Sequence, residues 1–372
     1  MENKQSFVLA AMFLVVVSFG GWAHAQSNSL PLGQVKLPVV RVSCPLGFNE
    51  GTACYSSTLS CPDTLDIGFT YGVVNPGGKD GTIVLFNGGD GTVVGFAQEV
   101  AEYTPPAHDF QTVQVMWSTA WEATEDGTGT SLKAAACRPA TLTDWLLNQK
   151  NVYAGGGMCA QGSSAGSAAV AYSLAEYGAS RYLDHVDLES GPVMSDISVG
   201  CNPQSPEMTV CPGDSCLTGG KGGWSDSPLY VGGDQNIIST WSGASGANAC
   251  LAGNRIPQQQ YDAWKQMSIV DGLTGRDADS TFAYPQTSVT GWLCGKPPGC
   301  NSALCQNNSA AEGQLFYENV TTPISVYRVD NCEGSEGVEQ GTVPQLNDEA
   351  GIDAIIADMV DNCGSKHRFA KH

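Results

Sequence analysis

A serine flanked by two glycines, near the middle of the chain, is the stretch whose residue types and spacing suit catalysis. Gly162, Ser164 and Gly166 form a G-x-S-x-G pattern, with a short apolar run before it and a helical run of small residues after it. A sharp strand-to-helix turn of this kind holds its central serine in strained geometry at a helix N-terminus. Developing negative charge is stabilised there. The pattern therefore predicts Ser164 as a nucleophile.

This stretch resembles the nucleophile elbow of the α/β-hydrolase superfamily, as found in secreted serine esterases and polyester depolymerases. The resemblance covers residues 64–200 well and residues 280–362 more loosely. It implies an α/β fold of the α/β-hydrolase type, a doubly wound and mostly parallel sheet with the elbow at its centre.

The resemblance also implies an oxyanion hole made of two backbone N–H groups. One belongs to the residue after the nucleophile, Ala165. The other belongs to the glycine-rich loop that follows the apolar run at 82–86, where we assign it to Gly89, with Asp90 as an equal alternative. The other interpretation of this loop is a plain glycine turn between a strand and a helix.

Strand and helix patterns alternate around the elbow, which favours parallel pairing with crossover helices. Apolar runs predict strands, and apolar residues at helical spacing predict helices. Strands are expected at 39–42, 65–73, 82–86, 112–117, 158–161, 185–188, 284–293 and 324–329, and helices near 96–103, 131–147, 258–267 and 351–360.

The remaining members of a serine-hydrolase triad are harder to find. If 284–293 and 324–329 are the seventh and eighth strands, the superfamily places the acid after the first of them and the histidine after the second. The loop 295–305 contains no carboxylate, however, and the loop 330–349 contains no histidine. The sequence departs from the family pattern at this point.

Two interpretations of the base stay open. In the first, Ser164, Asp330 and His367 form an irregular triad, with the C-terminal tail drawn towards Asp330 by a disulfide between Cys332 and Cys363. In the second, the elbow is retained without its histidine, and Glu333 or Glu336 takes that place. The other histidines are less suitable, because two precede strands, one is in the leader and one is terminal: His108, His185, His24 and His372.

The N-terminus and the cysteines predict an exported protein. Residues 1–25 have the charged start, apolar run and A-x-A site of a secretory signal peptide. All fourteen cysteines follow it, which indicates several disulfides. Cys159 is expected to be buried or bridged rather than nucleophilic. No Cys/His group has zinc-finger spacing, so we expect neither a metal nor a cofactor.

The expected domains are a disulfide-stapled lead-in at 26–63 and a hydrolase domain at 64–372. A cysteine-rich cap is inserted in the latter at about 200–280, and its tryptophans either line a substrate site or form a small core of their own. The formal net charge of −20 argues against nucleic acid and anionic membranes as partners. Oligomeric state is left open.

Two functions follow from these patterns. The first is a secreted serine hydrolase that acts on small or polymeric carboxylic esters through a Ser164 acyl-enzyme. The second is a degenerate α/β-hydrolase fold that acts as an extracellular binding or structural protein. A base within hydrogen-bond reach of Ser164 distinguishes them.

Overall fold

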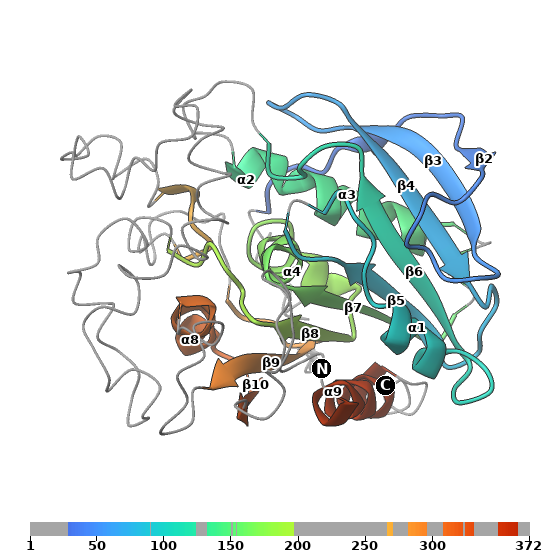
Figure 1. Ribbon diagram of the computed structural model, residues 1–372. Helices are drawn as coiled ribbons and strands as arrows, with labels where there is room; N and C mark the ends of the chain where they lie inside the picture. Colours follow the sequence, from blue (N-terminus) through green and yellow to red (C-terminus); the bar gives the residue numbers. More distant parts are fainter. Residues whose placement is uncertain are drawn as a thin grey trace, which may run out of the picture.

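The computed structural model describes residues 29–89, 91–123, 132–149, 152–153, 155–196, 266–270, 282–295, 308–322, 324–330 and 349–363. In these ranges ten strands form one sheet with helices on both faces (Figure 1). The signal peptide, nearly all of the predicted cap, and Asp90, Glu333, Glu336 and His367 lie outside the described residues. None of the helices in the described part of the chain combines the length and apolar character that a membrane span needs.

The sheet is mixed at one side and parallel through its centre. Its strands are β1 Gln34–Val35, β2 Val40–Val42, β3 Ala53–Ser60, β4 Ile67–Val74, β5 Gly81–Phe86, β6 Phe110–Trp117, β7 Gly157–Ser163, β8 His185–Glu189, β9 Ser288–Gly295 and β10 Ile324–Asp330. Their order is β1-β3-β4-β6-β5-β7-β8-β9-β10, with β2 paired to β3. Strand β4 is antiparallel to both of its neighbours, and every pair from β6 to β10 is parallel. The predicted central parallel strand at 158–161 is therefore confirmed as β7.

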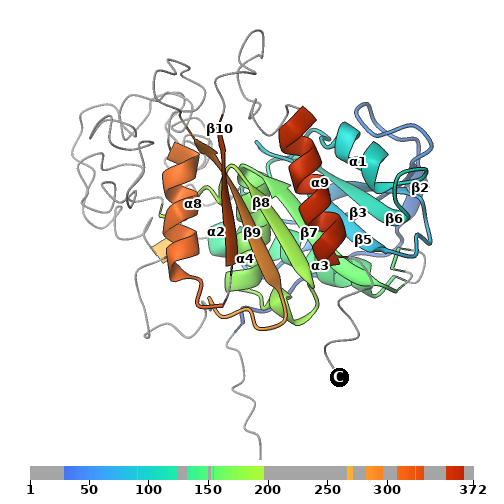
Figure 2. The ribbon, with the colours of Figure 1, turned by 90° about the horizontal axis from the view of Figure 1, so that it is seen from below.

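Helices cover the two faces of the sheet. They are α1 Ala97–Tyr103, α2 Leu132–Ala135, α3 Cys137–Leu147, α4 Ala165–Ala175, α8 Asn308–Asn319 and α9 Glu349–Cys363. Helices α3, α4 and α8 share one face, and α1 and α9 pack together on the other (Figures 1 and 2). This two-sided cover is the doubly wound arrangement that the sequence predicts.

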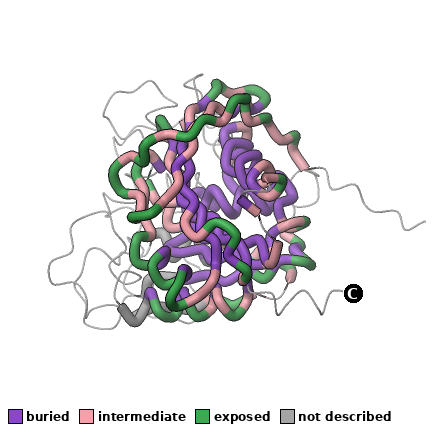
Figure 3. Tube along the Cα trace, turned by 90° about the vertical axis from the view of Figure 1, so that its right-hand side faces the viewer, coloured by how far each residue is buried: buried purple, intermediate pink, exposed green. Residues whose placement is uncertain are grey.

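The side chains of β5 explain why it lies inside the sheet. Ile83 and Leu85 face the core beneath α1 and α9, whereas Val84 and Phe86 face the core beneath α3 and α4. Successive residues of a strand point to opposite faces, so a continuous apolar run fits a strand that is covered on both sides. Figure 3 shows the buried trace in purple through the centre of the molecule, with exposed residues mostly in the peripheral loops.

Helix α9 buries the apolar stripe that its spacing predicts. Ile352, Ile355, Ile356 and Met359 are all buried, and the helix ends in a disulfide that joins Cys363 to Cys159 of β7. The predicted link between Cys332 and Cys363 is therefore wrong. The prediction failed because Cys159 and Cys363 are 204 residues apart in the sequence. No local sequence pattern indicates that two such distant residues become neighbours.

The other disulfides of the described residues lie in the N-terminal half. Cys44 pairs with Cys54, and Cys61 pairs with Cys137 at the start of α3. Segment 29–63 also contributes β1, β2 and β3 to the sheet, with β3 paired to β4. The lead-in is thus continuous with the sheet and tied to the helical layer.

Two elements differ in extent from their predicted ranges because of prolines. The helix expected at 131–147 is interrupted at Ala136, because Pro139, three residues further on, has no N–H to continue the hydrogen-bond ladder. The strand expected from Tyr284 begins at Ser288. Pro285 lies in a turn there, which the Thr287 N–H closes by donating to the Tyr284 carbonyl (3.1 Å).

Candidate active site

Ser164 occupies the turn between β7 and α4, where the sequence predicts a nucleophile elbow. Its φ of 53° and ψ of −116° lie outside the regions that L-residues favour. The Ser164 N–H donates to the Glu189 carbonyl of β8 (2.8 Å), and its own carbonyl accepts from Ser167 Oγ (2.5 Å). The surrounding strands and helix therefore hold the serine in a strained conformation, with its side chain partly exposed.

Both glycines of the motif are required by the way the turn packs. A Cβ at Gly162 would collide with the backbone of Gly166, and a Cβ at Gly166 would collide with the carbonyl oxygens of Phe86 and Asn87. Helix α4 can thus begin directly against the end of β5 only when residue 166 has no side chain. The G-x-S-x-G spacing is explained by close backbone contact on both sides of Ser164.

The glycine-rich loop after β5 lies against the serine. A Cβ at Gly88 would stand 3.2 Å from the Ser164 Cβ, so the loop backbone passes in contact with the nucleophile. Gly89 follows in left-handed backbone (φ 64°) and is exposed. Ala165 is the first residue of α4, and the N–H groups of a helix's first turn have no acceptor within the helix. Both predicted oxyanion donors therefore belong to segments adjoining Ser164.

The loop is held by hydrogen bonds from β6. The Trp117 N–H donates to the Gly91 carbonyl (2.9 Å), and Gln114 Nε2 donates to the Gly95 carbonyl (2.7 Å). The Gly91 backbone packs against the buried indoles of Trp117 and Trp121. A rigid support of this kind is what preorganised hydrogen-bond donors need.

Asp330 lies at the same edge of the sheet as Ser164 but not beside it. It is the last residue of β10 and is level with Gly295 at the end of β9. Strands β8 and β9 separate β10 from β7, so the strand spacing puts Asp330 about 14 Å to the side of the serine. The predicted pairing of Asp330 with His367 lies outside the described residues.

The two histidines of the described residues are at the opposite edge. His185 is the first residue of β8, and His108 precedes β6. Parallel strands β7 and β8 point the same way, so the start of β8 is far from the end of β7. Neither histidine is therefore within reach of Ser164. This agrees with the expectation from the sequence, in which both histidines precede strands.

A buried carboxyl in the loop after β8 was not among the site residues predicted from the sequence. The loop after β8 contains Asp196, which is 3 % exposed. This loop is fixed to the segment 266–270, because the Ile269 N–H donates to the Met194 carbonyl (3.0 Å). A Cβ at Gly191 would collide with Ser167 Oγ, so the loop packs against the first turn of α4. In the sequence, the only sign that Asp196 could be a site residue is that it follows a predicted strand.

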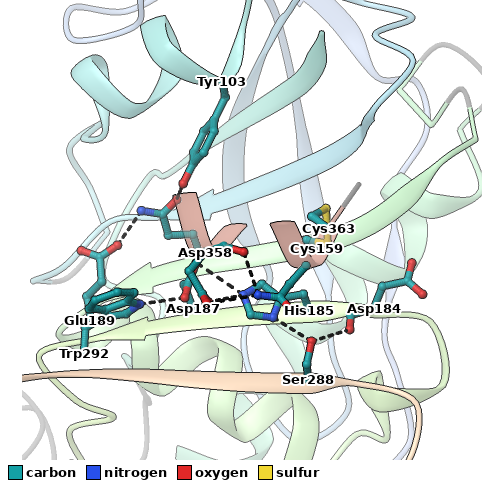
Figure 4. A network of polar contacts seen from close by, with 12 residues as sticks. Tyr103, Cys159, Asp184, His185, Asp187, Glu189, Ser288, Trp292, Asp358 and Cys363 are labelled. Carbon is teal, nitrogen blue, oxygen red and sulfur yellow. Dashed lines mark hydrogen bonds and ion pairs between the residues drawn. A yellow bond between two sulfur atoms is a disulfide. The ribbon is translucent and has the colours of Figure 1, made fainter. Parts of the chain in front are cut away.

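Beneath the elbow, polar side chains form a buried chain between α1 and the sheet (Figure 4). Tyr103 Oη donates to Gln161 Oε1 (2.8 Å), and Gln161 Nε2 donates to Glu189 Oε1 (2.5 Å). Burial raises the pKa of Glu189 well above its ordinary value, and the neighbouring Glu99 carboxylate adds to the shift. Burial likewise raises the pKa of Glu99, although its own backbone N–H partly offsets this.

We expect Glu99→Gln to stabilise the protein at pH 8 and to change little at pH 4. Because the folded-state pKa of Glu99 is raised, its protonated form stabilises the fold below the ordinary pKa, and this contribution is lost as pH rises through the raised value. Thermal unfolding at both pH values tests this, with Glu102→Gln on the exposed side of α1 as the matched control. An equal effect of Glu99→Gln at the two pH values would contradict it.

The strand order, with one antiparallel strand near its start and the elbow after the fifth strand of the series β3 to β10, defines an α/β-hydrolase fold. No protein-family model matches the sequence, and no curated protein matches it. The chain is similar to solved structures of an acetyl xylan esterase from Paenibacillus sp. R4 (12% identity, 90% of each chain covered, TM-score 0.46).

It is also similar to a brefeldin A esterase described as a bacterial homologue of human hormone sensitive lipase, with 14% identity, 87% of this chain and 79% of that chain covered, and a TM-score of 0.47. A third is a hyperthermophilic esterase from the archaeon Pyrobaculum calidifontis, with 12% identity, 83% and 84% covered, and a TM-score of 0.44. The fold is defined by the strand order of the chain itself.

Proposed function

We propose that this protein is a secreted serine hydrolase that cleaves carboxylic esters, of a small molecule or of a polymer, through an acyl-enzyme on Ser164. The observation that carries the proposal is the backbone of Ser164, with φ 53° and ψ −116°. Strain of this kind costs on the order of 1–3 kcal/mol and persists where the surroundings enforce it, typically at functional sites. Gly162, Gly166 and the β8 carbonyl enforce it here.

The reaction runs in two halves. Ser164 Oγ attacks the ester carbonyl carbon while a base takes the serine proton. The carbonyl oxygen becomes negatively charged and accepts hydrogen bonds from the N–H groups of Gly89 and Ala165. The proton then passes to the leaving alcohol as the ester bond breaks. Water repeats the attack on the acyl-enzyme, releases the acid and restores the serine.

The base comes from the chain after β10 in both forms of this proposal. In one form, His367 takes the proton and Asp330 orients it; in the other, Glu333 or Glu336 takes the proton directly. The described histidines support this choice by exclusion, since His108 and His185 lie at the far edge of the sheet.

Export is part of the proposal. The leader at residues 1–25 has the form of a secretory signal peptide, and the three disulfides of the described residues suit an oxidising compartment. The acidic net charge of −20 fits a neutral or cationic substrate rather than nucleic acid or an anionic membrane surface.

Labelling with a fluorophosphonate tests the proposal. The oxidised protein should react at one residue, and mass spectrometry of the digest should place the label on the peptide that contains Ser164. Ser164→Ala should not label. Ser163→Ala, which removes the neighbouring hydroxyl at the end of β7, should label at a rate within about 2–3-fold of the parent.

A protein that neither labels nor hydrolyses an activated ester would contradict the proposal. The elbow would then be retained in a degenerate hydrolase fold with a binding or structural role. Labelling on Ser163 or on a serine elsewhere would contradict the assignment of the nucleophile.

A further inference from the structure

Three ligand-type side chains meet between the first half of β8 and α9. His185 and Asp187 come from β8 and Asp358 from α9, and one nitrogen or oxygen atom of each lies within 4.8 Å of the other two. His185 Nε2 is 3.1 Å from Asp358 Oδ2 and 3.5 Å from Asp187 Oδ2. The side chains of His185 and Asp187 are fully buried, and that of Asp358 is 15 % exposed (Figure 4).

Hydrogen bonds outside this cluster fix how its members face one another. Ser288 Oγ donates to the Asp184 carbonyl (3.2 Å), so it accepts from the Nδ1–H of His185 (2.8 Å). When Nε2 carries no proton, its lone pair is directed at the two aspartates. Trp292 Nε1 donates to Asp187 Oδ1 (2.8 Å), which leaves Oδ2 facing the imidazole. Such outer hydrogen bonds are typical of metal-ligating histidines and carboxylates.

Beyond their ion-pair contacts with one another, the three inward-facing atoms form no hydrogen bond among the described residues. They are His185 Nε2, Asp187 Oδ2 and Asp358 Oδ2. A proton on Nε2 can be donated to one aspartate only, which leaves the other buried carboxylate oxygen unpaired, and an unpaired buried charge is costly. One divalent cation at the centre of the three atoms would satisfy all of them.

We propose that His185, Asp187 and Asp358 bind a divalent transition-metal ion of the Zn²⁺ type. Zinc bonds of about 2.0–2.2 Å at tetrahedral angles place two ligand atoms about 3.3–3.6 Å apart, close to the two separations of His185 Nε2 from the aspartate oxygens. One imidazole and two carboxylates suit Zn²⁺ better than Mg²⁺ or Ca²⁺, which prefer oxygen ligands alone. Asp358, at the exposed rim, provides the route by which the ion enters and a place for a water ligand.

The ion would be structural. It would join β8 to α9 on the face of the sheet that α9 covers, and α9 is already joined to β7 by Cys159–Cys363. The three ligands are up to 173 residues apart in the sequence, which is why cysteine and histidine spacing gave no sign of the site and why the sequence analysis expected no metal.

The test uses the full secreted chain in its oxidised form. Metal content is measured by inductively coupled plasma mass spectrometry after purification without chelator, and thermal unfolding is followed after EDTA treatment and addition of Zn²⁺. We expect one Zn²⁺ per chain and a rise in Tm on the order of 5 °C when free Zn²⁺ is 100 times its Kd. Asp358→Asn should abolish both. Asp353→Asn, an exposed aspartate on the same helix, should leave both unchanged.

Absence of bound metal together with no response of Tm to Zn²⁺ would overturn the proposal, and the cluster would then be an imidazolium shared between two carboxylates. Stabilisation by Ca²⁺ or Mg²⁺ but not by Zn²⁺ would overturn it as well. An equal loss of binding in Asp353→Asn would show that Zn²⁺ binds elsewhere on the acidic surface. His185→Gln, if it folds, should behave as Asp358→Asn does.

Discussion

Ester hydrolysis by Ser164→Ala is expected to fall by a factor on the order of 10⁴–10⁶, measured as kcat/KM for p-nitrophenyl acetate. The reason is that the Ser164 hydroxyl forms the covalent bond to the substrate. Its position depends on the strained turn at residue 164, so a neighbouring serine cannot replace it. Ser163→Ala is the matched control and should remain within about 2–3-fold of the parent. Equal activity of Ser164→Ala and the parent would remove the serine from the mechanism.

The same assay distinguishes the two candidate bases when residues 364–372 are removed. Cys363 is bonded to Cys159, which precedes Ser164 by five residues of β7, or about 16 Å. The four residues from Cys363 to His367 span at most about 14 Å when fully extended, so only a fully extended tail with its imidazole directed at the serine would bring His367 to Ser164. We therefore expect the truncated protein, whose disulfide stays intact, to retain activity within about 3-fold.

In that case Glu333→Gln or Glu336→Gln should lower the rate by on the order of 10²–10⁴. Activity should also persist into acidic solution until the carboxyl is protonated. Conversely, a truncated protein as inactive as Ser164→Ala, with the same loss in His367→Ala, would establish the irregular triad with Asp330 and contradict the carboxylate base.

Removal of the Cys159–Cys363 disulfide is the change that we expect to destabilise the fold most. The two cysteines are 204 residues apart, and the chain-entropy treatment of a loop of that length gives about 5 kcal/mol of stabilisation. The paired variant Cys159→Ala with Cys363→Ala should lower the free energy of unfolding by that order, measured by urea unfolding. It should also loosen α9 from the sheet.

The disulfide between Cys44 and Cys54 provides the matched control. It closes a separation of only 10 residues, so its paired alanine variant should cost about 2–3 kcal/mol by the same treatment. A loss from Cys159–Cys363 no larger than the loss from Cys44–Cys54 would show that loop length does not determine these stabilities.

The parallel centre of the sheet could be predicted because each element carries its own local pattern. Strand β5 is an unbroken apolar run, and α9 has four buried residues at helical spacing. Strand β3 was missed because its sequence, ACYSSTLS, has little apolar character and forms a strand through pairing with β4. Helix α8 was missed as well, since its residues show only a weak apolar stripe.

The candidate sites likewise include features that a local sequence pattern predicts and features that it does not. The elbow is local in sequence, so its motif predicts the strained serine and the close backbone contacts of both glycines. Asp196 and the cluster of His185, Asp187 and Asp358 depend on which loops and strands become neighbours, and only the folded sheet determines that. The pairing of Cys363 with Cys159 rather than with Cys332 is a third example.

The distance in sequence between Cys159 and Cys363 also affects how the chain is made. At 5–20 residues per second, a ribosome needs about 10–40 s to add the 204 residues that separate them. Strands β1 to β8 can assemble during that interval, while Cys159 has no partner and nothing covers it where α9 will later lie. Cysteines that are synthesised earlier can react with it first. We therefore expect correctly paired protein to accumulate best in a host compartment that rearranges wrong disulfides, rather than in one that only oxidises thiols quickly.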